Sequence, residues 1–189
     1  MNNDNNDNDN DNDNKITSSS SSKINESAGT VTGNLVLTII DSLSGETRDI
    51  LNLKNLVVNT GKEYIAACLA YGENERKVDH IALGLSNKNP MKSDTRLDGE
   101  IAREAIQSVE HEPGTSSVTY RVFFPPGVAT GSISEAGIIR SSEKEEESDS
   151  PVIMTLLPRN ETLLSRTVFP MVLKREIDSV TIEWTITIN

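Results

Sequence analysis

The stretch Val180-Thr181-Ile182-Glu183-Trp184-Thr185-Ile186-Thr187-Ile188 decides the fold. Large apolar residues occupy every second position, and polar residues, mostly threonine, fill the positions between them. In a β-strand, a period of two places each kind of side chain on its own face. The stretch therefore predicts a strand with one face buried in a core.

Short apolar runs separated by turn residues recur upstream of this strand. A second alternation, at 118–124, ends at Pro125-Pro126-Gly127, where two prolines lack the amide donors that a strand ladder needs. About eight strands at this spacing predict a mainly β fold, an antiparallel β-sandwich-like domain. The other strand candidates are residues 35–40, 50–58, 78–85, 132–139, 152–157 and 163–169.

One segment, residues 60–72, has a helical pattern instead. Thr60 and Glu63 have the spacing of a capping box, in which each side chain bonds an unpaired amide of the first turn. Gly72 is suited to end the helix with a positive φ. We therefore expect one short α-helix, packed through an apolar stripe of Tyr64, Ile65, Cys68 and Leu69. On this stripe, Cys68 is expected to be a small core side chain rather than a nucleophile.

The composition divides the chain into an arm and one domain. Residues 1–28 are an Asn/Asp alternation followed by a serine run, which predicts a disordered N-terminal arm. Residues 29–189 are long enough for a single β-sandwich-like domain with an acidic loop at 143–150. Within the arm, the spacing of Asp7, Asp9, Asp11 and Asp13 resembles a calcium loop, but the turn glycine and the later bidentate glutamate are missing.

The formal net charge of -11 is concentrated in two segments. Residues 1–15 carry five Asp and one Lys, and residues 143–150 carry five acidic residues and one Lys, so each contributes -4 and the remainder only -3. This balance argues against a nucleic-acid partner, which would require clustered Lys and Arg. Apolar runs are too short to cross a bilayer and no secretory signal is evident, so we expect a soluble protein made in a cytoplasm.

The sequence offers few groups for chemistry. The two histidines, His80 and His111, lie outside any catalytic motif, and a hydrogen-bonded structural role is expected for His80 and an exposed turn for His111. The single cysteine excludes an intrachain disulfide, and neither a paired Cys/His metal framework nor a glycine-rich phosphate loop is present. We therefore predict no catalytic, metal-binding or cofactor-binding residue and no enzyme activity.

Three charged residues are candidates for a structural ion pair. Gly137 interrupts a predicted strand, which indicates a bulge or a close backbone approach, and the neighbouring Glu135 would need a partner if it were covered. We predict a pair of Arg103 with either Glu135 or Glu100 that fixes the strand register. A helix at 100–104 would place Glu100 and Arg103 on one face and a strand would separate them, and the sequence leaves this choice open.

Several short blocks of sequence, taken in their order along the chain, resemble those of a known protein family. The blocks are Asn-Leu-Val-Val-Asn-Thr-Gly at 55–61, His-Ile-Ala-Leu-Gly at 80–84, Leu97 with Glu100 and Arg103, Glu-Ala-Gly-Ile at 135–138, Ser-Arg-Thr-Val-Phe-Pro at 165–170 with Lys174, and the closing strand at 181–188. In this order they resemble the particle-proximal domains of tail-collar and tail-fibre proteins of tailed bacteriophages, over residues 33–189. The resemblance implies a β-rich module that docks an appendage to a virion.

The resemblance implies that the partners are other virion proteins and that the chain forms a homo-oligomer or part of a symmetric assembly. It also implies that the protein is made in the host cytoplasm and located in the virion. The strand at 178–189 is either an uncovered edge that pairs with another subunit or lies within the sheet. A capsid decoration or head-fibre protein and a glycan-binding β-sandwich module are the alternatives. Because Trp184, Tyr120 and Phe124 fall on apolar strand faces, core packing is favoured over a sugar-binding platform.

Overall fold

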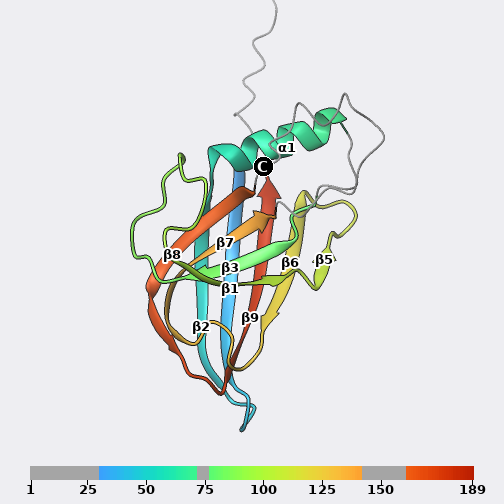
Figure 1. Ribbon diagram of the computed structural model, residues 1–189. Coiled ribbons are helices and arrows are strands. Elements are labelled where there is room, and N and C mark those ends of the chain that lie inside the picture. Colours follow the sequence, from blue (N-terminus) through green and yellow to red (C-terminus); the bar gives the residue numbers. More distant parts are fainter. Residues whose placement is uncertain (1–29, 72–76, 142–160) are drawn as a thin grey trace, which may run out of the picture.

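The structure is a computed structural model that describes residues 30–71, 77–141 and 161–189 (Figure 1). The predicted disordered arm, the acidic loop at 143–150, the strand candidate at 152–157 and the helix-ending Gly72 lie outside the described residues.

The described part of the chain is mainly β with one helix, which confirms the predicted fold class. All neighbouring strands pair antiparallel. The elements are β1 Val31–Asp41, β2 Thr47–Val57, α1 Asn59–Tyr71, β3 His80–Gly84, β4 Glu100–Ala105, β5 Ser108–Glu110, β6 Ser117–Phe124, β7 Gly131–Arg140, β8 Thr162–Lys174 and β9 Asp178–Ile188.

The strands form one curled sheet in the order β4-β3-β7-β8-β2-β1-β9-β6-β5. The curl produces two layers, β5-β6-β9-β1-β2 and β4-β3-β7-β8, that face each other across the core (Figure 1). The layers are joined where β2 leaves β1 and pairs with β8 through Leu56 and Val57. On the opposite side, the chain passes directly from β4 into β5, the two outer strands of the sheet.

The closing strand β9 lies in the middle of its layer rather than at an edge. It pairs with β1 from Val31↔Ile188 to Asp41↔Asp178, and with β6 on its other side. The predicted half-buried alternation is confirmed, because Val180, Ile182 and Trp184 are fully buried. With both sides occupied, β9 has no free edge for another subunit, and that alternative is wrong.

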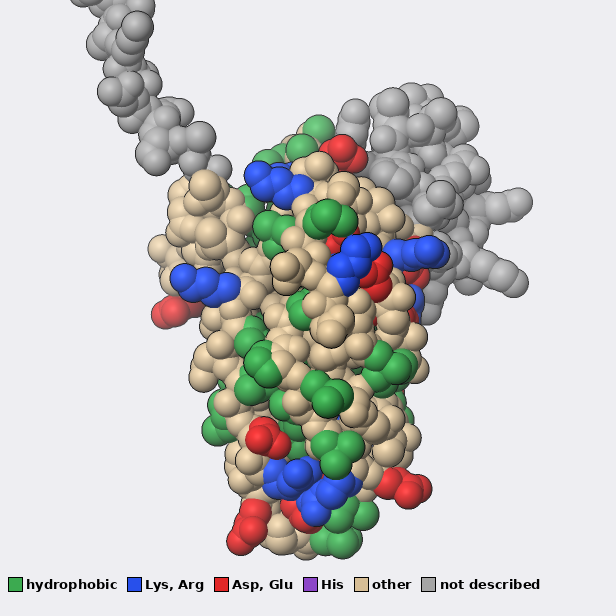
Figure 2. Space-filling model, turned by 90° about the vertical axis from the view of Figure 1, so that its left-hand side faces the viewer, with side chains coloured by type: hydrophobic (Ala, Val, Ile, Leu, Met, Phe, Trp, Pro, Cys, Tyr) green, Lys and Arg blue, Asp and Glu red, His purple; other side chains and the backbone are tan. Residues whose placement is uncertain are grey.

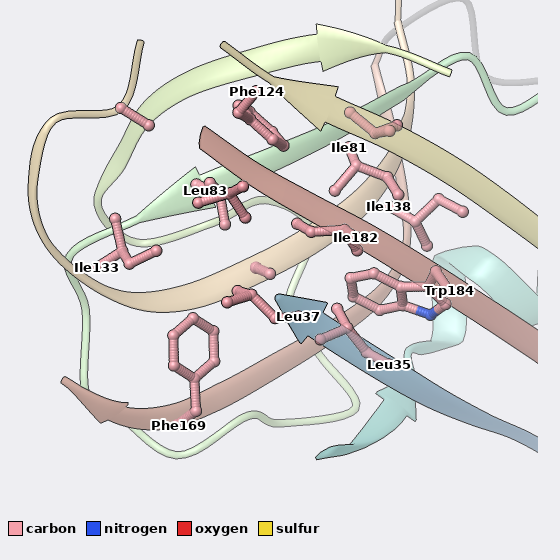
Figure 3. Close-up of a cluster of buried hydrophobic side chains, with 14 of the residues drawn as sticks. Leu35, Leu37, Ile81, Leu83, Phe124, Ile133, Ile138, Phe169, Ile182 and Trp184 are labelled. Atoms are coloured by element: carbon pink, nitrogen blue, oxygen red, sulfur yellow. The ribbon is translucent and has the colours of Figure 1, made fainter. Parts of the chain in front are cut away.

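The core is built from the inward faces of both layers. Leu35, Leu37, Ile182 and Trp184 come from β1 and β9, and they point toward side chains of β3 and β7 (Figure 3). Burying one such side chain contributes roughly 1.5–3 kcal/mol, so the alternation in β9 is a main source of stability. The facing side chains are Ile81, Leu83, Ile133 and Ile138, all fully buried.

Helix α1 crosses one end of the layers and contacts β8 (Figure 1). The predicted helix is confirmed, but the capping box is wrong, because α1 begins at Asn59 and Thr60 lies within its first turn. The Thr60 hydroxyl donates to the carbonyl of Leu163 at 2.8 Å. Gly61 lies so close to β8 that an added Cβ would overlap the carbonyl oxygen of Leu164. The expected apolar stripe is shorter than predicted, since the Leu69 side chain is exposed and Cys68 is only partly buried.

Candidate functional site

A buried ion network lies on the outer face of the β7–β8 layer. Arg166 of β8 and Glu135 of β7 are both fully buried. The Arg166 guanidinium donates to Glu135 Oε2 from Nε at 3.0 Å and from Nη2 at 2.8 Å, and Nη1 donates to Asp94 Oδ2 at 2.7 Å. Although burial opposes it, the Met91 amide and Arg166 hold the pKa of Asp94 below its usual value. All three charges are therefore paired in the folded chain.

The same network holds the loop at 85–99 against the sheet. The Glu135 carboxylate accepts amide hydrogen bonds from Ser86, Asp98 and Gly99, the last at 2.7 Å. A Cβ added at Gly84 would overlap the Glu135 side chain, so glycine is required for the carboxylate to reach the loop. The network joins a long loop to two strands, which is a structural role.

The structure forms one of the two predicted ion pairs of Arg103 and not the other. Arg103 does not pair with Glu135, because Arg166 occupies that carboxylate. Arg103 instead donates to both oxygens of Glu100, at 2.6 and 2.8 Å, and to Glu161 at 2.7 Å. The Glu100–Arg103 alternative is therefore the pair that forms, and its effect on register stays a prediction.

Glu100 and Arg103 meet although β4 is a strand. The β3–β4 register shifts between Leu83↔Ala102 and Gly84↔Glu100, so Ile101 is an extra residue in β4. A bulge of one residue reverses the alternation of faces, which brings positions three apart to the same side. The sequence did not predict this bulge.

Arg166 was missed as a partner of Glu135, although a signal was available. It lies in the middle of the strand candidate at 163–169, between the apolar pairs Leu163-Leu164 and Val168-Phe169, where a strand covered on both faces would bury it. β8 is covered on its outer face by α1 and the 85–99 loop. Arginine at a doubly covered position requires a carboxylate partner nearby.

The residue types of a hydrolase triad occur together at His80, but their geometry does not form one. Asp79 Oδ1 lies 2.8 Å from His80 Nδ1, and the Ser141 hydroxyl donates to Asp79 Oδ2 at 2.5 Å. Serine and histidine therefore both bind the carboxylate, whereas nucleophile activation requires a serine bonded to the histidine. Burial opposes it, but the bonds from Ser141 and His80 lower the pKa of Asp79. His111 is exposed and contacts the carbonyl of Ser117.

A second ion cluster closes the opposite end of the molecule. The buried carboxylate of Asp178 pairs with Arg48 and with Arg175 Nη2 at 2.8 Å. Lys174 is fully buried and donates to the carbonyl oxygens of Asp178 at 2.7 Å and Pro125 at 3.3 Å. Burial lowers the pKa of Lys174. These bonds connect the β8–β9 turn to the end of β6.

In the described residues, no group of three or more His, Cys, Asp or Glu side chains is arranged to hold a metal ion. No helix within the described ranges is both long and apolar enough to cross a membrane. Among the aromatic side chains whose burial the structure describes, Phe123 is exposed, Trp184 and Phe124 are fully buried and Tyr120 is half-buried. These side chains therefore do not form a multi-aromatic sugar platform.

The side of the sandwich between β2 and β8 is open. Among the described strands, β2 and β8 pair only at Leu56↔Arg166 and Val57↔Ser165, and beyond that point no described strand pairs with their facing edges. Figure 2 shows this side, with hydrophobic side chains along its length. Three apolar side chains of the two strands are more than half exposed: Ile50 at 59%, Met171 at 71% and Leu173 at 57%. We call these three residues and the two free edges the open side.

No protein-family model, curated protein or solved structure matches the chain.

Proposed function

We propose that the chain is a non-enzymatic structural protein of a tailed-phage particle, an adaptor or appendage component at the tail fibre, baseplate or collar. The order of sequence blocks supports the phage setting through resemblance. The open side supports a role in assembly, and it is the observation that carries the proposal.

The chemistry of the open side suits a protein neighbour. Free strand edges offer unpaired backbone donors and acceptors, and an added strand satisfies them with main-chain hydrogen bonds. The exposed Ile50, Met171 and Leu173 supply apolar area beside those edges. We infer that another virion protein covers the open side.

The ion clusters support the same proposal. Glu135, Arg166 and Asp94 hold a loop, and Asp178 with Arg175 closes a turn. Each of these charged side chains forms an ion pair with another residue of the fold. None of these side chains is therefore left oriented toward a substrate. A capsid decoration or head-fibre protein would use the same surface. A glycan-binding module is the weaker alternative, because the described aromatic side chains are mostly in the core.

The test uses particles from cells that encode the chain. Gold-labelled antibody against the domain should mark purified particles at one fixed position in negative-stain electron microscopy. In particles carrying Met171→Glu with Leu173→Glu, the label should fall by about tenfold, because two buried charges cost more than about 1.4 kcal/mol of binding. The control is Lys77→Glu, an exposed residue away from β2 and β8.

Unlabelled particles together with binding of the chain to a glycan array would favour the glycan-binding alternative. Label at the capsid instead of the tail would favour decoration or a head fibre. Equal label with Met171→Glu, Leu173→Glu and with wild type would reject the open side as the docking surface.

A further inference from the structure

A pocket of about 610 Å³ lies where β1 and β2 separate. The β1–β2 register ends at Gly33↔Asn55, because β2 then turns to pair with β8. Thr30 and residues 31–32 of β1 form one wall and residues 55–57 of β2 the other, while the start of α1 and the 85–99 loop complete the pocket. The pocket is thus a consequence of the strand that joins the two layers.

The lining of this pocket is cationic. Lys62 of α1 and Lys92 of the loop both line it, and none of the Asp or Glu residues that the structure describes does. Both lysines are exposed, and no acidic residue that the structure describes forms an ion pair with either. A carboxylate entering the pocket would meet two ammonium groups that lack a described counter-charge.

Asn55 adds an amide to the same wall. Its side chain folds over Gly33, where a Cβ would overlap it. Both its Oδ1 and its Nδ2 are buried and have no hydrogen-bond partner. An unpaired buried amide costs roughly 1–3 kcal/mol, so a ligand that supplied one bond to it would gain stability.

We propose that this pocket binds carboxylates of the chain's own N-terminal segment, residues 1–29, in the same molecule. The segment joins the pocket wall directly, since Thr30 is one of the lining residues. It carries six acidic residues and two lysines, a net charge of -4 opposite two lysines. Glu26 stands four residues before Thr30, and an extended chain of that length spans up to about 14 Å. Glu26 is therefore the first carboxylate within reach of Lys62 and Lys92.

Tryptic cleavage of the full chain tests this binding, because Lys15 and Lys23 are natural sites in the segment. Followed by intact mass, cleavage after Lys23 should be about threefold slower or more in the chain than in a synthetic peptide of residues 1–29 at low salt. Lys62→Glu with Lys92→Glu should restore the peptide's rate, and so should about 0.5 M NaCl, which screens exposed ion pairs. Glu26→Gln in the chain should also make cleavage after Lys23 faster. The rate is compared with that of a peptide of residues 1–29 that carries the same substitution.

The control is Lys77→Glu, which makes one Lys→Glu change outside the pocket and should leave protection intact, as compared with each single variant, Lys62→Glu and Lys92→Glu. Melting temperatures of all variants must agree within a few degrees, so that cleavage reports the segment and not the fold. Equal cleavage in chain and peptide, or protection that survives Lys62→Glu with Lys92→Glu, overturns the proposal. Protection that disappears on dilution overturns the assignment to the same molecule. This inference is independent of the phage proposal, since it concerns the free chain.

Discussion

Arg166 and Arg103 are two arginines whose side chains differ in how much they are exposed to water. The Arg166 side chain is fully buried between Glu135 and Asp94, whereas that of Arg103 is 30% exposed beside Glu100 and Glu161. Removing one member of a buried pair leaves an uncompensated charge in a medium that solvates it poorly. At an exposed pair, water replaces the lost partner.

Arg166→Met should therefore lower the free energy of unfolding by about 3–5 kcal/mol, and the matched variant Arg103→Met by no more than about 1 kcal/mol. Urea denaturation followed by Trp184 fluorescence measures both. Similar losses for the two variants would show that burial does not set the value of these pairs. If Arg103→Met changed neither the melting temperature nor assembly, the prediction that Arg103 fixes the strand register would be refuted.

At the scale of elements, helix α1 is attached to β8 through its first turn. The Thr60 hydroxyl binds the Leu163 carbonyl, and the Val58 amide binds that of Leu164. Gly61 permits this approach because it has no Cβ. Glycine within a helix normally costs about 1 kcal/mol relative to alanine, so packing must offset that cost here.

Gly61→Ala should destabilise the protein by about 1–3 kcal/mol despite the better helix propensity of alanine, because the methyl group would push the helix away from β8. Glu63→Ala is the control in the same turn, with an expected change within about 0.5 kcal/mol, since its side chain is exposed. Thermal unfolding by circular dichroism measures both variants. A stabilised Gly61→Ala protein would refute the close contact.

Elements could be predicted from the sequence where periodicity determines the outcome. The alternation in β9 and the helical spacing after Asn59 each depend on residues close in the chain. Alternation reports which face of a strand is buried, but it does not report the neighbouring strand, so the central place of β9 was left open. The Glu135–Arg166 pair was missed for the same reason, because it depends on how β7 and β8 align. The bulge at Ile101 leaves no local pattern either.

For the molecule as a whole, carboxylates with lowered pKa values make the stability of the fold depend on pH. Hydrogen bonding by Arg175 lowers the pKa of Asp178 from 3.8 to about 2. A carboxylate with a lowered folded-state pKa stabilises the fold fully above its unfolded value and loses that contribution as the pH falls toward the folded value. The lowered pKa values of Asp79 and Asp94 act in the same direction.

The melting temperature should therefore fall between about pH 4 and about pH 2. Asp178→Asn should cost about 2 kcal/mol at neutral pH, and its difference from wild type should shrink across this interval, because protonation removes the same charge. Calorimetry of both proteins over the interval measures the effect. A constant difference at every pH would show that the Asp178 charge is not responsible.

The pairing of β1 with β9 also determines when the centre of this layer can fold. The first and last described strands meet along eleven registered positions at the centre of one layer. A ribosome releases β1 long before β9 is synthesised, so the middle of that layer cannot form until β9 has also emerged. Contacts so distant along the chain slow the search for the native state. Until β9 arrives, the apolar face of β1 needs temporary cover, and the nascent chain is most exposed to aggregation during that interval.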